Sequence, residues 1–150
     1  MQERFETFTV LINRISRDIR KIKNQEMADY HLRSAHVSCL YYVYSLESVT
    51  SAELCEHCEE DKATISRAVD YLETNGFLLR GISAKRYKSP LLLTEKGRDA
   101  GKRIAEKIGS ILETVSHALT ENERIEFYRC LSTISRSLEA IVQNNEEKEM

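Results

Sequence analysis

The sequence has little proline or glycine, with one Pro and five Gly among 150 residues. This scarcity permits long helices and argues against an all-β fold with many turns. The longest uncharged stretch around the apolar centre covers only residues 34–46, too short to span a bilayer. The N-terminal MQERFETF is polar and offers no secretory apolar core. We therefore expect a cytoplasmic protein with no membrane partner, whose four cysteines are reduced thiols.

The charge is unevenly distributed along a chain whose net charge is only −2. Residues 62–103 contain ten Lys or Arg and four Asp or Glu, a local balance of +6. Residues 104–150 contain five basic and nine acidic residues, a balance of −4. A basic segment on an acidic protein predicts a local face that binds a polyanion. With 41% hydrophobic and 31% charged residues, the rest of the composition is that of a soluble, folded domain.

Apolar residues recur at helical spacing along most of the chain, with capping residues at several of the starts. The pattern predicts a long helix over 3–27, a helix capped by Ser34, short helices at 51–58 and 62–75, and long helices capped by Thr94 and Thr120. Asp61 is the expected N-cap of the fourth helix, which Asn75-Gly76 closes. Residues 77–82 and 89–93 predict a hairpin, with Pro90 on an edge strand, and residues 143–150 a frayed end.

These elements predict one domain, 1–150, of mainly α class with a small β-hairpin wing (α+β). Its DNA-binding region would be a winged helix-turn-helix at 34–94, flanked by dimerisation helices at 1–33 and 95–145. The long outer helices carry more apolar surface than the small middle can cover. A second copy of the chain is the simplest partner, so we expect a two-fold homodimer.

The helix-turn-helix places short polar side chains and one arginine where a second helix enters the major groove. Arg can bind guanine with two hydrogen bonds, while Thr and Ser can reach bases or phosphates. The alternative is a solvated helix followed by a basic turn. The candidate DNA-binding residues are Ser51, Lys62, Ala63, Thr64, Ser66 and Arg67 on the helices, and Lys85, Arg86, Tyr87 and Lys88 at the hairpin tip.

The middle of the chain resembles the multiple antibiotic resistance regulators, the MarR family. The resemblance is carried by Glu53-Leu54, Asp61-Lys62-Ala63-Thr64-Ile65-Ser66-Arg67, Val69-Asp70-Tyr71-Leu72-Glu73, Asn75-Gly76-Phe77, Arg80, Arg86 and Leu93-Thr94-Glu95-Lys96-Gly97-Arg98. It implies a triangular dimer, a recognition helix at 62–75, a wing tip at 83–88 and regulation by an effector. Ala63, Thr64 and Arg67 then correspond to groove-facing positions and Arg86 to the wing arginine. Lys85 stands where the family usually has an Asp.

Cys55-Glu56-His57-Cys58 has the spacing of a zinc or redox motif, but no second pair of ligands follows it. We interpret both cysteines as packing residues, with redox sensing or metal binding as open alternatives. Zinc-responsive relatives place ligands near Glu26 and His36 and on the fifth helix, where only His117 is available. No cofactor is therefore expected, and these three residues are metal candidates only under the alternative.

Tyr41 and Tyr44 could line a cavity for a small-molecule effector, although such an aromatic stripe also suits a core. No Gly-rich phosphate loop and no paired nucleophile and base are present, so we expect no enzyme activity. The sequence thus predicts a sequence-specific, DNA-binding transcriptional regulator. We expect it to act as a repressor that binds an inverted-repeat operator in double-stranded DNA. A winged helix that binds only other proteins is the remaining alternative.

Overall fold

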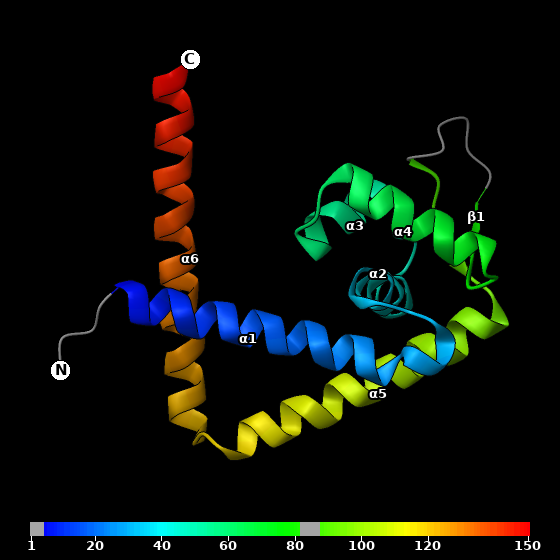
Figure 1. The fold of residues 1–150 in the computed structure, drawn as a ribbon, viewed down its shortest axis with the longest axis horizontal. Coiled ribbons are helices and arrows are strands. Elements are labelled where there is room, and N and C mark those ends of the chain that lie inside the picture. The colour runs from blue at the N-terminus through cyan, green and yellow to red at the C-terminus, as the bar shows by residue number, and fades with distance from the viewer. Residues whose placement is uncertain (1–4, 82–87) are drawn as a thin grey trace. The chain divides into compact units, whose positions relative to one another are not determined.

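The computed structural model describes residues 5–81 and 88–150, with the side chains of residues 5 and 6 left aside (Figure 1). It contains mainly helices and one antiparallel hairpin, which confirms the predicted fold class. The chain forms two compact units, residues 1–107 and 108–150, which are treated separately below. The elements are α1 (Phe5–Glu26), η1 (Ala28–Tyr30), α2 (Ser34–Ser45), α3 (Ser51–Cys58), α4 (Lys62–Thr74), β1 (Leu78–Arg80), β2 (Leu91–Leu93), α5 (Glu95–His117) and α6 (Glu121–Glu149).

The core of the first unit lies where α2 packs against α3 and α4. Leu40 of α2, Leu54 of α3 and Leu72 of α4 are all completely buried. On α4 the buried Ile65, Val69 and Leu72 follow the helical period, so one face is fixed to α2 and the other faces outward. This packing holds the two short helices of the helix-turn-helix in place.

Side-chain caps fix the starts of α3, α4 and α6, and the caps of α4 and α6 were predicted from the sequence. Thr50 and Thr120 each form a reciprocal capping box with a glutamate three residues later. Asp61 caps α4, because its carboxylate accepts a hydrogen bond from the Thr64 backbone N–H. The prediction for Ser34 was wrong: Arg33 is the N-cap of α2. The Ser34 N–H donates instead to the Asn24 side chain, which ties α2 to the end of α1.

The hairpin is shorter than the sequence predicted, with three residues in each strand. Its register pairs Leu78 with Leu93 and Arg80 with Leu91. The Leu91 N–H also donates to the Val49 carbonyl at 2.8 Å, and an isolated bridge joins Thr50 to Pro90. The segment before α3 therefore pairs with the outer edge of β2, which ties the hairpin to the helix-turn-helix.

The segment Thr94 to Gly97 joins the hairpin to α5 through specific contacts. The Thr94 hydroxyl accepts a hydrogen bond from the Gly97 N–H and lies 2.5 Å from the Gly76 carbonyl, to which it donates. Lys96 donates to the Asn75 carbonyl and lies over the Phe77 ring. Thr94 thus caps α5 as predicted, and the start of α5 is bound to the end of α4.

The second unit contains the end of α5 and all of α6. Helix α6 continues to Glu149, so the predicted fraying from Gln143 and the predicted helical limit at 145 were wrong. No residue of α6 is buried, although apolar side chains recur along it. Within the described parts of the chain, no helix is long and apolar enough to cross a membrane.

Candidate nucleic-acid interface

The first turns of α4 present a polar, basic face on a rigidly held helix. Lys62, Ala63, Ser66 and Arg67 are exposed and Thr64 is half-buried, while Ile65 between them is completely buried. The turn that precedes α4 is tight, because Glu59 adopts a left-handed conformation with φ of 52°. The structure therefore brings five of the six predicted helix residues onto one outward surface.

Two hydrogen bonds organise the start of this face. The Asp61 carboxylate accepts from the Thr64 N–H at 2.6 Å, and the Arg67 guanidinium donates to the Thr64 hydroxyl at 3.4 Å. The hydrogen bonds from Thr64 lower the pKa of Asp61, which keeps the cap ionised. Thr64 thus links the cap to Arg67 one turn later. This arrangement orients a fork-shaped donor outward from the helix start.

Ser51 and the hairpin tip differ from the rest of the predicted set. Only 2% of Ser51 is exposed, and its hydroxyl is buried with no hydrogen-bond partner among the described residues. Ser51 begins α3 directly after Thr50, which is bridged to Pro90, and its buried side chain is unavailable for a contact with DNA in this arrangement. Lys85, Arg86 and Tyr87 lie outside the described residues, whereas Lys88 is exposed.

Arg80 connects the hairpin to α4, a role that the sequence analysis missed. Its guanidinium pairs with Asp70 at 3.2 Å and also with Glu73, and its side chain is only 15% exposed. Asp70 and Glu73 are spaced three residues apart and therefore share one face of α4. This acidic pair, followed by an arginine on the next strand, is the sequence pattern that could have predicted the ion pairs. The contact fixes the direction of β1 relative to the helix.

No family model matches the sequence, and no curated protein matches it. Solved structures do match. A MarR family regulator from Neisseria meningitidis has a TM-score of 0.83 at 19% identity, over 96% of this chain and 99% of that one. The DNA complex of Staphylococcus aureus MepR has a TM-score of 0.78 at 18% identity, over 87% and 96% of the two chains. A MarR structure has a TM-score of 0.70 at 24% identity, over 97% and 99%.

This chain has the MarR-family fold. At these identities the likeness concerns the fold, which confirms the fold that the sequence motifs implied. The MarR-type motif from Leu93 to Gly97 is explained by its contacts, since it joins the hairpin, the end of α4 and the start of α5.

Two of the three metal candidates of this MarR-fold chain, Glu26 and His36, have other partners. Glu26 pairs with Lys107 at 3.3 Å, and the His36 ring nitrogen Nδ1 accepts from the Arg33 N–H at 3.1 Å. The His36 ring stacks on Tyr71 with centroids 4.2 Å apart, and burial together with the Arg33 charge lowers the pKa of His36. His117 lies in the last turn of α5. Among the described residues, no three His, Cys, Asp or Glu side chains group as metal ligands.

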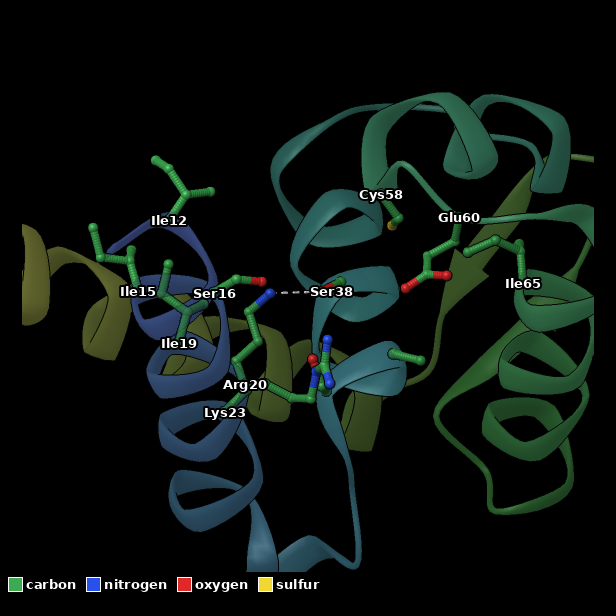
Figure 2. Close-up of a pocket in the computed structure, with 12 residues that line it drawn as sticks. Ile12, Ile15, Ser16, Ile19, Arg20, Lys23, Ser38, Cys58, Glu60 and Ile65 are labelled. Atoms are coloured by element: carbon green, nitrogen blue, oxygen red, sulfur yellow. Dashed lines mark hydrogen bonds between the residues drawn. The ribbon is translucent and has the colours of Figure 1, made fainter. Parts of the chain in front are cut away.

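The two effector candidates occupy half-buried positions on α2. The Tyr41 ring contacts Tyr42 edge-on, and the Tyr44 side chain lies against α5 at Gly101. A separate cavity of about 310 Å³ opens between α1, α2 and the turn before α4. Figure 2 shows Ile12, Ile15 and Ile19 on the α1 side of this cavity, facing Cys58, Glu60 and Ile65. The Lys23 ammonium donates to the Ser38 hydroxyl at 2.9 Å within it.

Proposed function

We propose that this chain is a MarR-family transcriptional regulator that binds operator DNA sequence-specifically, and that it is not an enzyme. The outward face at the start of α4 carries the proposal. It combines two cations, two hydroxyls and a small residue on a helix whose opposite face is buried against α2 and α3. Such a helix suits the major groove, where short polar side chains and arginine read base edges. The MepR complex with DNA supports the same use of this fold.

Within the proposed interface, Arg67 binds a base edge and Lys62 binds a phosphate. Thr64 and Ser66 contact bases or phosphates, and Ala63 permits close approach to the groove. The predicted wing residues Lys85, Arg86 and Tyr87, with Lys88, add contacts to phosphates or the minor groove beside the recognition helix. Ser51 is left out of this set because its side chain is buried.

The proposed regulator is a homodimer on an inverted-repeat operator. In the second unit no residue of α6 is buried, and most of its apolar side chains are exposed to solvent. Four of them are each about half exposed, namely Ile125, Phe127, Ile141 and Val142. In the first unit Ile15 on α1 is also half exposed. Apolar stripes of this length are covered in a soluble protein by a partner, and a second copy offers the same helices. Dimerisation would present two α4 helices to successive major grooves.

The proposed action is repression tuned by a small-molecule effector. One structure with this fold is Staphylococcus aureus MarR in complex with salicylate and kanamycin, at 17% identity and a TM-score of 0.74 over 89% of this chain and 90% of that one. The half-buried Tyr41 and Tyr44 are the residues that we propose for such a ligand.

A binding experiment with the DNA upstream of the chain's own gene tests the proposal. We expect a salt-dependent gel shift that excess random DNA does not remove. Arg67→Ala should cost about 1–3 kcal/mol per half-site and narrow the difference between operator and random DNA. Arg17→Ala is the matched control, because Arg17 is an exposed arginine on α1 that is not among the proposed DNA contacts. Equal operator binding by the Arg67 variant and the control would refute the assignment of α4, and the absence of any shift would favour a protein-binding module.

A further inference from the structure

Tyr71 joins the proposed recognition helix α4 to the segment between α1 and α2. Its hydroxyl donates a hydrogen bond to the His31 carbonyl at 2.8 Å. Its ring stacks on the His36 ring, with centroids 4.2 Å apart and planes inclined by 12°. Tyr71 follows Arg67 by four residues, so it lies one turn further along α4 on the same side of the helix. One side chain of α4 therefore contacts both the residue that ends η1 and the first turn of α2.

The acceptor of this hydrogen bond has a fixed position. His31 adopts a left-handed conformation with φ of 58°, which a residue other than glycine keeps only where its surroundings impose it. The His31 N–H donates to the Ala28 carbonyl at 2.9 Å, and the Leu32 N–H donates to the Met27 carbonyl at 3.2 Å. Leu32 and Met27 are almost completely buried. Because Met27 directly follows the last residue of α1, the His31 carbonyl is held in place beside the end of that helix.

The stacked ring is fixed by the start of α2. The Nδ1 atom of His36 accepts a hydrogen bond from the Arg33 N–H at 3.1 Å, which sets the direction of the ring. The Ser34 N–H donates to the Asn24 side chain of α1 at 2.7 Å, so the start of α2 is itself bound to α1. Both contacts of Tyr71 therefore end on groups whose positions depend on α1.

We propose that Tyr71 is a positioning residue that sets the direction of α4 relative to α1, and with it the distance between the two α4 helices of a dimer. This inference rests on the proposed function, in which α1 contacts the second copy and α4 contacts DNA. Helix α4 has 13 residues and is about 20 Å long, so a tilt of about 5° displaces one end relative to the other by about 2 Å. Hydrogen bonds to base edges tolerate a much smaller change in length. Tyr71 thus acts on the base contact of Arg67 through the helix that both residues share.

This role differs from that of the core side chains of α4. Ile65, Val69 and Leu72 bury one face of the helix against its neighbours. Apolar burial has no preferred direction, whereas a hydrogen bond depends on angle as well as distance. The buried side chains therefore keep α4 in the fold, and Tyr71 selects its direction.

Tyr71→Phe tests the proposal, because it removes only the hydroxyl group and keeps the ring. The probes are the DNA upstream of the chain's own gene, the same DNA with one base pair inserted at the centre of the inverted repeat, and a duplex with a single half-site. The unaltered chain should bind the first DNA more tightly than the second. In Tyr71→Phe we expect this preference for the native spacing to fall about threefold to tenfold, the range that corresponds to one neutral hydrogen bond. The affinity for the single half-site should not change.

Tyr30→Phe is the matched control, because Tyr30 lies in the same segment and contacts Phe77 through its ring. It should keep the spacing preference of the unaltered chain. The Tm of each variant is measured alongside. A lower Tm of Tyr71→Phe with an unchanged spacing preference would show a merely structural hydroxyl and overturn the proposal. A loss of affinity for the single half-site as large as that for the full operator would also overturn it, because the hydroxyl would then act at the DNA itself.

The unaltered chain separates this inference from the function on which it rests. If that chain binds the upstream DNA and Tyr71→Phe keeps the same spacing preference, only the role of Tyr71 is refuted. An unaltered chain that binds both spacings equally also refutes this role, because no spacing is then set. If the unaltered chain binds none of the three DNAs, the proposed function is refuted, and the role of Tyr71 in DNA binding is refuted with it.

Discussion

Two glycines of α5 give a stringent test of how this helix packs. A Cβ atom added at Gly97 would lie 1.9 Å from the Phe77 carbonyl oxygen, far inside contact distance. A Cβ atom added at Gly109 would meet nothing within 4 Å. Both residues lie inside the same helix, so the same Gly→Ala change separates close packing from helix propensity.

The expected effects have opposite signs. Gly109→Ala should stabilise the protein by about 0.5–1 kcal/mol, because alanine loses less backbone entropy in a helix. Gly97→Ala gains the same amount of stability from helix propensity. The added methyl group must also displace the Phe77 peptide, and overpacking of this kind typically costs about 1–3 kcal/mol. We take the upper end, because the obstructing atom belongs to the backbone rather than to a flexible side chain. The net expectation is a loss of about 2 kcal/mol, which places the two variants about 3 kcal/mol apart.

Thermal unfolding at equal chain concentration measures this difference, and the concentration matters because dimerisation would raise Tm. For a chain of this size 1 kcal/mol corresponds to about 2–4 °C, so the variants should differ by about 6–12 °C. Equal Tm values for the two variants would refute the close approach of α5 to Phe77. They would also remove the structural explanation for glycine in the motif that ends at Gly97.

Three further predictions follow from the proposed dimer and from the lowered pKa of His36. Sedimentation at micromolar concentration should give twice the chain mass, and a monomer would contradict the dimer. Footprinting should protect an inverted repeat with half-site centres about 10 base pairs apart, whereas protection of a single half-site would contradict the two-fold arrangement. The pKa of His36 is lowered on folding, so the unfolded chain binds its proton more readily and stability should fall as pH drops below 6.5. His36→Gln should lose less Tm than the unaltered chain between pH 7.5 and pH 5.5, and an equal loss would show that His36 does not titrate as described.

Local patterns predicted the helices well, because the helical period and the capping chemistry depend on residues that are close together in the sequence. The end of α1 and the caps at Asp61 and Thr120 follow directly from such patterns. The prediction that Ser34 is an N-cap was wrong because any serine before an apolar run suits that role. The Ser34 N–H instead donates a hydrogen bond to Asn24, which lies ten residues earlier on another helix. The pairing of the hairpin also depends on residues far apart in the sequence, since the Leu91 N–H donates a hydrogen bond to the Val49 carbonyl.

The candidate site shows the same division between local and non-local information. The outward face of α4 was predictable, because the alternation of buried Ile65 and exposed Ser66 is a property of one helix. The burial of Ser51 was not predictable, because its helix begins beside Thr50, which is bridged to Pro90 far along the chain. The local sequence shows that Ser51 lies in the first turn of a short helix, but it does not show which strand pairs with the segment before that helix. A serine at a helix start therefore suits both a DNA contact and a buried position, and only the non-local pairing decides between them.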